Sequence, residues 1–113
     1  MNPSNNIHEV AIAATTEAAT SEAFELRSTA SMQNPVNYSV ISSPLGAGEK
    51  VSVEIWNEAG SAWQAFNRDG GPVELTQHND WLPLDAVSLR VRFVKTVTAD
   101  AVGVSFVRPR GLV

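Results

Sequence analysis

The stretch "VSLRVRFVKT", residues 87–96, has the longest regular alternation of apolar and polar side chains in this chain. Three apolar side chains, Phe93 among them, fall on one side of an extended backbone, and Arg90 and Arg92 fall on the other. Successive side chains of a β-strand point to opposite faces, so the pattern predicts a strand with one buried and one solvated face. We therefore expect Phe93 in the core and both arginines outside it.

Similar alternation recurs on both sides of this strand, separated by clusters of Gly, Pro, Asn and Ser. It predicts strands at 23–29, 36–41, 51–56 and 102–107, with Phe106 facing inward on the last. Residues 78–85, "HNDWLPLD", read as a connecting loop. About eight short strands with no helix predict an all-β fold, an antiparallel β-sandwich of jelly-roll type.

The length of 113 residues is that of one domain, and a chain of this size buries enough surface to fold without a disulfide or metal. It contains no cysteine. We expect a flexible N-terminal arm at 1–9, a β-sandwich at 10–107 and a C-terminal tail at 108–113. No apolar run is long enough to span a membrane, and residues 1–10 do not resemble a secretory signal, so we expect synthesis in the cytoplasm.

Charge is distributed unevenly along the chain. Residues 1–89 carry three basic and eleven acidic side chains, whereas residues 90–113 carry five basic and one acidic. One interpretation is that Arg90 and Arg92 lie on a solvated strand face; the other is that they form a basic edge that meets an acidic partner or an acidic face of the chain itself. The chain is acidic overall and no aromatic residues alternate with the basic cluster, which argues against nucleic-acid binding.

Catalytic and cofactor motifs are missing from the sequence. His8 and His78 are isolated from each other, and no G-x-S-x-G elbow, phosphate-binding loop or calcium loop occurs. Carboxylate pairs are no more frequent than twelve acidic residues supply by chance. We expect no enzymatic activity, no metal and no cofactor.

The same alternation predicts whether each of the three tryptophans lies in the core or at the surface. Trp56 lies on the face opposite the apolar residues of its strand, so we expect it at the surface or in an interface. Trp63 and Trp81 are interpreted as core residues, with Trp81 closing one end of the sandwich.

Three segments carry a resemblance to a known family: "GEKVSV" at 48–53, "NEAGSAW" at 57–63 and "VTADAVGV" at 97–104. Together, over roughly residues 18–107, they resemble small β-proteins of tailed bacteriophage particles. In size and strand number the chain is most similar to the capsid cement proteins of short-tailed phages, also called decoration or staple proteins. The shared motifs are structural rather than catalytic.

The resemblance implies a jelly-roll-like structural protein of the virion that binds the outer capsid surface and stabilises contacts between major capsid subunits. It also implies a homo-oligomer, a dimer or a trimer. The residues themselves, rather than the family, indicate the partner-binding positions: Trp56, Arg90, Arg92, Arg108 and Arg110. The alternative is a glycan- or receptor-binding β-sandwich of a phage tail or host-recognition protein, with Trp56 stacking on a sugar.

Overall fold

Strands alone make up the regular structure of residues 6–26, 37–68, 70–85 and 89–109, which are the residues described in this computed structural model. The all-β prediction is confirmed. Eight strands have three or more residues, and four have two. In chain order they are β1 (Asn6–Thr15), β2 (Ala19–Thr20), β3 (Phe24–Leu26), β4 (Asn37–Ser42), β5 (Val51–Asn57), β6 (Ala62–Ala65), β7 (Asn67–Arg68), β8 (Gly71–Pro72), β9 (Glu74–Leu75), β10 (Trp81–Asp85), β11 (Leu89–Lys95) and β12 (Val102–Pro109).

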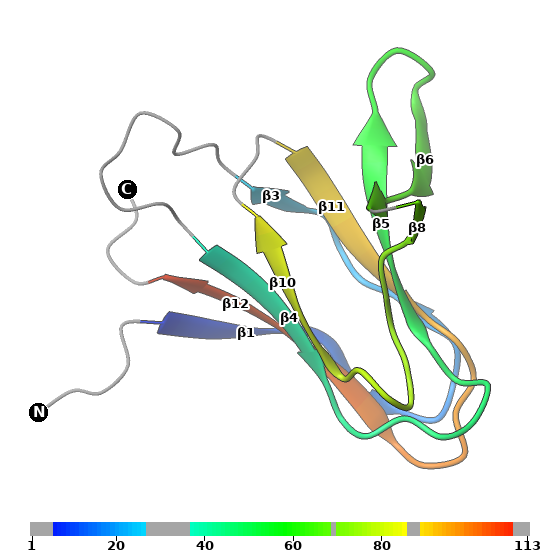
Figure 1. Cartoon of the computed structure of the whole chain (residues 1–113). Coiled ribbons are helices and arrows are strands. Elements are labelled where there is room, and N and C mark those ends of the chain that lie inside the picture. The colour runs from blue at the N-terminus through cyan, green and yellow to red at the C-terminus, as the bar shows by residue number, and fades with distance from the viewer. Residues whose placement is uncertain (1–5, 27–36, 69, 86–88, 110–113) are drawn as a thin grey trace, which may run out of the picture.

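Two antiparallel sheets face each other (Figure 1). Sheet A has the order β1-β12-β4-β10. Sheet B has the order β2-β11-β5-β6, with β3 also beside β11 and β9 beside β5. The β5–β6 hairpin extends beyond the neighbouring strands at the top of Figure 1. Strands β7 and β8 form a separate two-stranded ribbon.

The core lies between the sheets and is centred on aromatic rings. Phe106 of sheet A lies 5.8 Å from Phe93 and 5.0 Å from Phe24 of sheet B, between ring centroids. Tyr38 stacks on Phe106 at 5.6 Å. Phe93 is 0% exposed and Phe106 1%. The predicted inward orientation of both phenylalanines is therefore confirmed, and with it the register of the two long strands.

Three sequence-based boundaries differ from the structure. Residues 81–85, expected in a loop, form β10, which pairs with β4 from Trp81 opposite Ile41 to Asp85 opposite Asn37. Leu82 and Leu84 turn toward the core, so the short segment does alternate, but Pro83 and the neighbouring polar residues hide the pattern. Near the chain ends, β1 begins at Asn6, inside the segment expected to be a flexible arm, and its partner β12 continues to Pro109, inside the expected C-terminal tail.

The outer edge of β10 offers few hydrogen-bonding groups at Pro83. A residue's N–H and C=O point to the same side of a strand, and proline has no N–H. The carbonyl oxygen of Pro83 accepts a hydrogen bond from Nη1 of Arg68 at 3.2 Å. At this position the edge therefore has no donor, and its acceptor is occupied.

Candidate functional site

The outer surface of sheet B carries a cluster of aromatic and charged side chains, here called the Trp–Arg face: Glu54, Trp56, Trp63 and Arg92. Strand register brings the four together, because Trp56 pairs with Trp63 across β5 and β6, and Arg92 of β11 pairs with Glu54 of β5. All four point away from the core and are half-buried. The predicted outward orientation of Trp56 is confirmed.

Contacts inside the Trp–Arg face fix the side chains relative to one another. Nε of Arg92 lies 2.7 Å from Oε1 of Glu54, and the guanidinium carbon lies 4.5 Å from the centroid of the Trp63 ring. The Trp56 and Trp63 rings meet edge to face, with centroids 5.5 Å apart and an interplanar angle of 66°. Aromatic pairs of this geometry and guanidinium–indole contacts each contribute about 0.5–1.5 kcal/mol. The cluster is thus ordered without a partner.

The hairpin beyond the Trp–Arg face is held by short-range hydrogen bonds. The Trp56 indole N–H donates to the Glu58 carboxylate, 3.1 Å to Oε2, and the Asn57 side-chain amide donates to Gln64 at 2.9 Å. The N–H of Gly60 donates to the side-chain oxygen of Asn57 at 3.1 Å. Ser61, next in the turn, has a φ of 51°, in the left-handed region that favours glycine.

The arginines predicted to bind a partner already have carboxylate partners within the chain. Nε of Arg90 lies 3.1 Å from Oε2 of Glu25, where both side chains are largely exposed, and Arg92 is paired with Glu54. Their positive charges are therefore offset locally, and the face attracts an acidic partner less strongly than two unpaired arginines would. The side chain of Arg108 and all of Arg110 lie outside the described part of the chain.

Two of the three tryptophan assignments are wrong. Trp81, expected to close one end of the core, is 51% exposed on the outer side of sheet A. Trp63, also expected in the core, lies half-buried on the Trp–Arg face, while Phe66 packs partly against the core. The reason is register: a residue directly opposite outward-facing Trp56 must face outward as well. The turn "NEAGSA" between the two tryptophans was the available signal for this pairing.

A buried ammonium group holds the opposite end of the sandwich together. Lys95 is 1% exposed, and its Nζ donates to the backbone oxygens of Glu17 at 2.8 Å and Thr96 at 3.1 Å. Burial lowers the pKa of Lys95, against the opposing attraction of the Glu49 and Glu17 carboxylates. Both carbonyls satisfy the ammonium, so its role here is structural.

The Glu49 carboxylate braces the turn beside Lys95. Oε1 of Glu49 accepts from the N–H of Gly46 at 2.7 Å, and Oε2 accepts from the N–H of Ala99 at 2.8 Å. These two backbone hydrogen bonds lower the pKa of Glu49. Each carboxylate oxygen therefore has a structural partner.

Elsewhere in the described part of the chain, the ionisable side chains do not form a cluster typical of a metal site. Within residues 6–26, 37–68, 70–85 and 89–109, no three His, Asp or Glu side chains are grouped as a metal would require. None of the segments described is a helix long and apolar enough to cross a membrane. Comparison with protein-family models, curated proteins and solved structures finds no match. A functional assignment therefore rests on the side chains that the outer surfaces of the two sheets present.

Proposed function

We propose that the protein is a non-enzymatic structural protein of a bacteriophage particle that binds the outer capsid surface and stabilises contacts between major capsid subunits. The observation that carries the proposal is the Trp–Arg face at the base of the projecting β5–β6 hairpin (Figure 1). The resemblance of segments 48–53, 57–63 and 97–104 to capsid cement proteins supports the choice of partner.

The chemistry of the Trp–Arg face suits attachment to a protein surface. Tryptophan and arginine are the residues that most often dominate binding energy in protein interfaces. Here the Trp63 ring, the Arg92 guanidinium and the Glu54 carboxylate hold one another in place before binding. Preorganised side chains lose less conformational entropy on association, so more of the contact energy appears as affinity.

A sugar-binding role is less well supported by the same geometry. Stacking on a sugar requires an open ring face, and Arg92 covers one face of Trp63 while the Trp56 ring meets Trp63 edge to face. The indole N–H of Trp56 is also bonded to Glu58. The glycan- or receptor-binding alternative is therefore an outcome to be tested rather than a second proposal.

The test is co-sedimentation of the purified protein with phage heads that lack it. Wild-type protein should saturate the heads, and Trp56→Ala should weaken binding by about 2 kcal/mol, or roughly 30-fold, as expected for a central aromatic contact. Val97→Ala is the matched control, since Val97 is 68% exposed on the β11–β12 loop, away from the Trp–Arg face.

Occupancy should fall only modestly with added salt, because Arg92 of the Trp–Arg face and the neighbouring Arg90 are both paired within the chain. The proposal fails if wild-type protein leaves the heads bare, or if Trp56→Ala binds them as tightly as wild type. Binding to host polysaccharide that requires Trp56, with no binding to heads, would establish the glycan alternative.

A further inference from the structure

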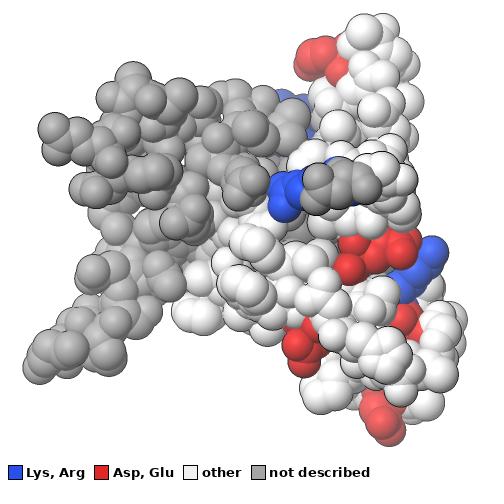
Figure 2. Space-filling view, in the orientation of Figure 1, with Lys and Arg blue, Asp and Glu red and all other residues white. Residues whose placement is uncertain are grey.

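The outer surface of sheet A differs from that of sheet B in carrying no ion pairs among its described side chains. Strand register places four outward residues in one row across the sheet: Trp81, Ile41, Ser105 and Val10. The outward positions of sheet A whose side chains the structure describes include no Lys, Arg, Asp or Glu. In Figure 2 the atoms over the middle of β4 are white, with an acidic group at its lower margin and undescribed residues beside its start. A sheet face whose described side chains carry no charge is typical of an interface rather than a solvated surface.

The row contains the two most exposed large apolar side chains of sheet A. Val10 is 71% exposed at one end of the row, and Trp81 is 51% exposed at the other. Both side chains expose apolar surface to water, and a binding partner would bury that surface. Of all side chains, tryptophan has the largest apolar surface to bury.

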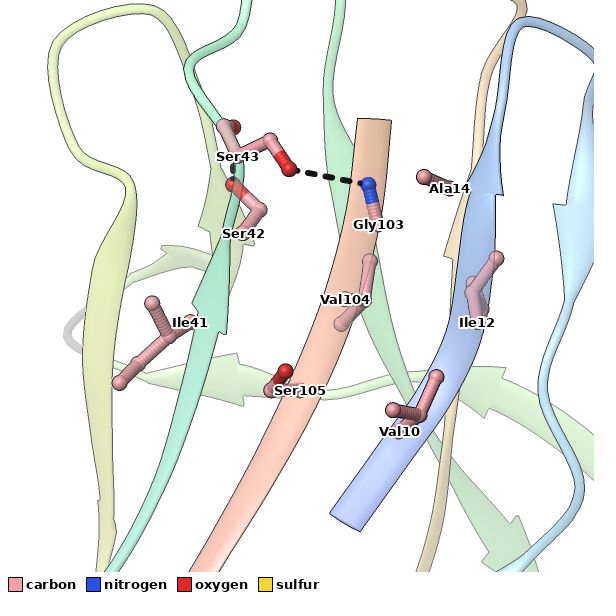
Figure 3. Close-up of a pocket in the computed structure, with 9 residues that line it drawn as sticks. All are labelled: Val10, Ile12, Ala14, Ile41, Ser42, Ser43, Gly103, Val104 and Ser105. Atoms are coloured by element: carbon pink, nitrogen blue, oxygen red, sulfur yellow. Dashed lines mark hydrogen bonds between the residues drawn. The ribbon is translucent and has the colours of Figure 1, made fainter. Parts of the chain in front are cut away.

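A hollow of about 330 Å³ lies on the same face, over β12 between β1 and β4 (Figure 3). Gly103 forms its floor, where a side chain would come within 3.3 Å of the backbone of Ile12 and Ala14. The Ser43 hydroxyl accepts a hydrogen bond from the Gly103 N–H at 3.1 Å, which leaves the floor without an unpaired donor there. All nine lining residues are apolar or small and uncharged. The hollow is thus suited to an aromatic ring.

We propose that two copies of this chain pack sheet A against sheet A, with Trp81 of each copy in the Gly103 hollow of the other. The Trp81 indole (the knob) and the Gly103 floor of the hollow lie on one face, about two strand spacings or ~10 Å apart across the sheet and two residues or ~7 Å apart along it. One two-fold axis between the sheets, halfway between these two points, places both indoles in both hollows at once. Any other partner would need its own matching knob and hollow, whereas a second copy supplies both by symmetry.

The size and charge of the face agree with a dimer of moderate affinity. Four strands at ~4.8 Å spacing and ~20 Å length give each copy a face of about 400 Å² in projection; the relief of the side chains raises its accessible surface above this value, toward the ~800 Å² per partner of a standard interface. The chain has a net charge of −4, so two copies repel each other less through this face, whose described side chains include no carboxylate, than through the acidic outer surface elsewhere. We expect a dissociation constant in the micromolar range.

Sedimentation velocity over a concentration series tests the pairing with a charge exchange. Trp81→Glu and Ser105→Arg each place one charge on the face, at the knob and at the edge of the hollow, so each variant alone should be monomeric. An equimolar mixture should recover a dimer. In it, the carboxylate introduced at the knob of one chain meets the guanidinium introduced beside the hollow of the other, and the remaining Trp81 enters an unaltered hollow. Neither variant should lose the far-ultraviolet circular dichroism spectrum of a β-protein.

A pair of valines provides the matched control. Val10→Arg on the face should weaken the dimer at least about 100-fold, because both symmetry-related contacts are altered. Val97→Arg introduces the same charge at a similarly exposed valine on the β11–β12 loop, and it should leave the dimer unchanged. The inference is overturned if wild-type protein stays monomeric at about 1 mM or forms a trimer. It is also overturned if the mixture stays monomeric. These measurements use purified protein alone, so their outcome is independent of capsid binding.

Discussion

Replacing Phe93 with alanine removes the ring at the centre of the core. The Phe93 side chain is fully buried, and its ring centroid lies 5.9 Å from that of Phe24 and 5.8 Å from that of Phe106. Buried Phe→Ala changes cost about 3–5 kcal/mol, because apolar contact is lost and a cavity remains. A domain of 113 residues is stable by roughly 6–17 kcal/mol, so the change removes a large share of the free energy of unfolding.

Thermal unfolding followed by circular dichroism measures the effect. With an unfolding entropy of about 2.1 cal/mol/K per residue, a loss of 3–5 kcal/mol lowers the Tm by roughly 12–21 °C. Phe66→Ala is the control: Phe66 is half-buried at the edge of the core, with Arg68 over its ring at 5.3 Å, and should cost distinctly less. Protein concentration is held constant, because the dimer proposed above would add to the apparent stability. A Tm for Phe93→Ala within about 5 °C of wild type would refute the register of β11.

Two further changes test local structure. Glu49→Gln should destabilise the fold at neutral pH and progressively less in acid. The pKa of Glu49 in the folded protein lies below the ordinary 4.5, so the stabilisation by its carboxylate is complete above pH 4.5 and is lost as the pH falls through the folded pKa. A difference in urea midpoint between wild type and Glu49→Gln that stays constant from about pH 7 to about pH 3 would contradict this. Ser61→Gly should raise the Tm by about 2–4 °C, since glycine adopts the positive φ at position 61 without steric cost; a lower Tm would show that the serine side chain stabilises the turn.

The sequence predicts well those parts of the fold that depend on local alternation. Residues 89–95 and 102–107 alternate over a full strand length, and both strands lie where expected, with Phe93 and Phe106 inside. The two-residue strands, such as β2 and β9, exist only because a neighbouring strand supplies their hydrogen bonds. No pattern of two residues carries that information.

The candidate site depends on register and sheet order, which the sequence does not display. Arg90 and Glu25 are 65 positions apart and meet because β3 pairs with β11. Trp63 faces outward because it lies opposite Trp56. Trp81 looked like a core residue because leucines follow it closely, but those leucines and the tryptophan occupy opposite faces of β10. Alternation gives the side on which a residue lies only after the strand has been recognised.

The blocked position on β10 bears on how the protein behaves when many copies are crowded together. A bare strand edge is a template on which further strands can add, and a solution of such molecules tends toward open-ended fibres. Pro83, with its carbonyl held by Arg68, interrupts that template at the middle of the strand. Replacing the proline would restore a donor on an edge made largely of apolar residues. At this edge the fold thus blocks open-ended addition of strands, whereas the pairing of two copies through sheet A that we propose would stop at a closed pair.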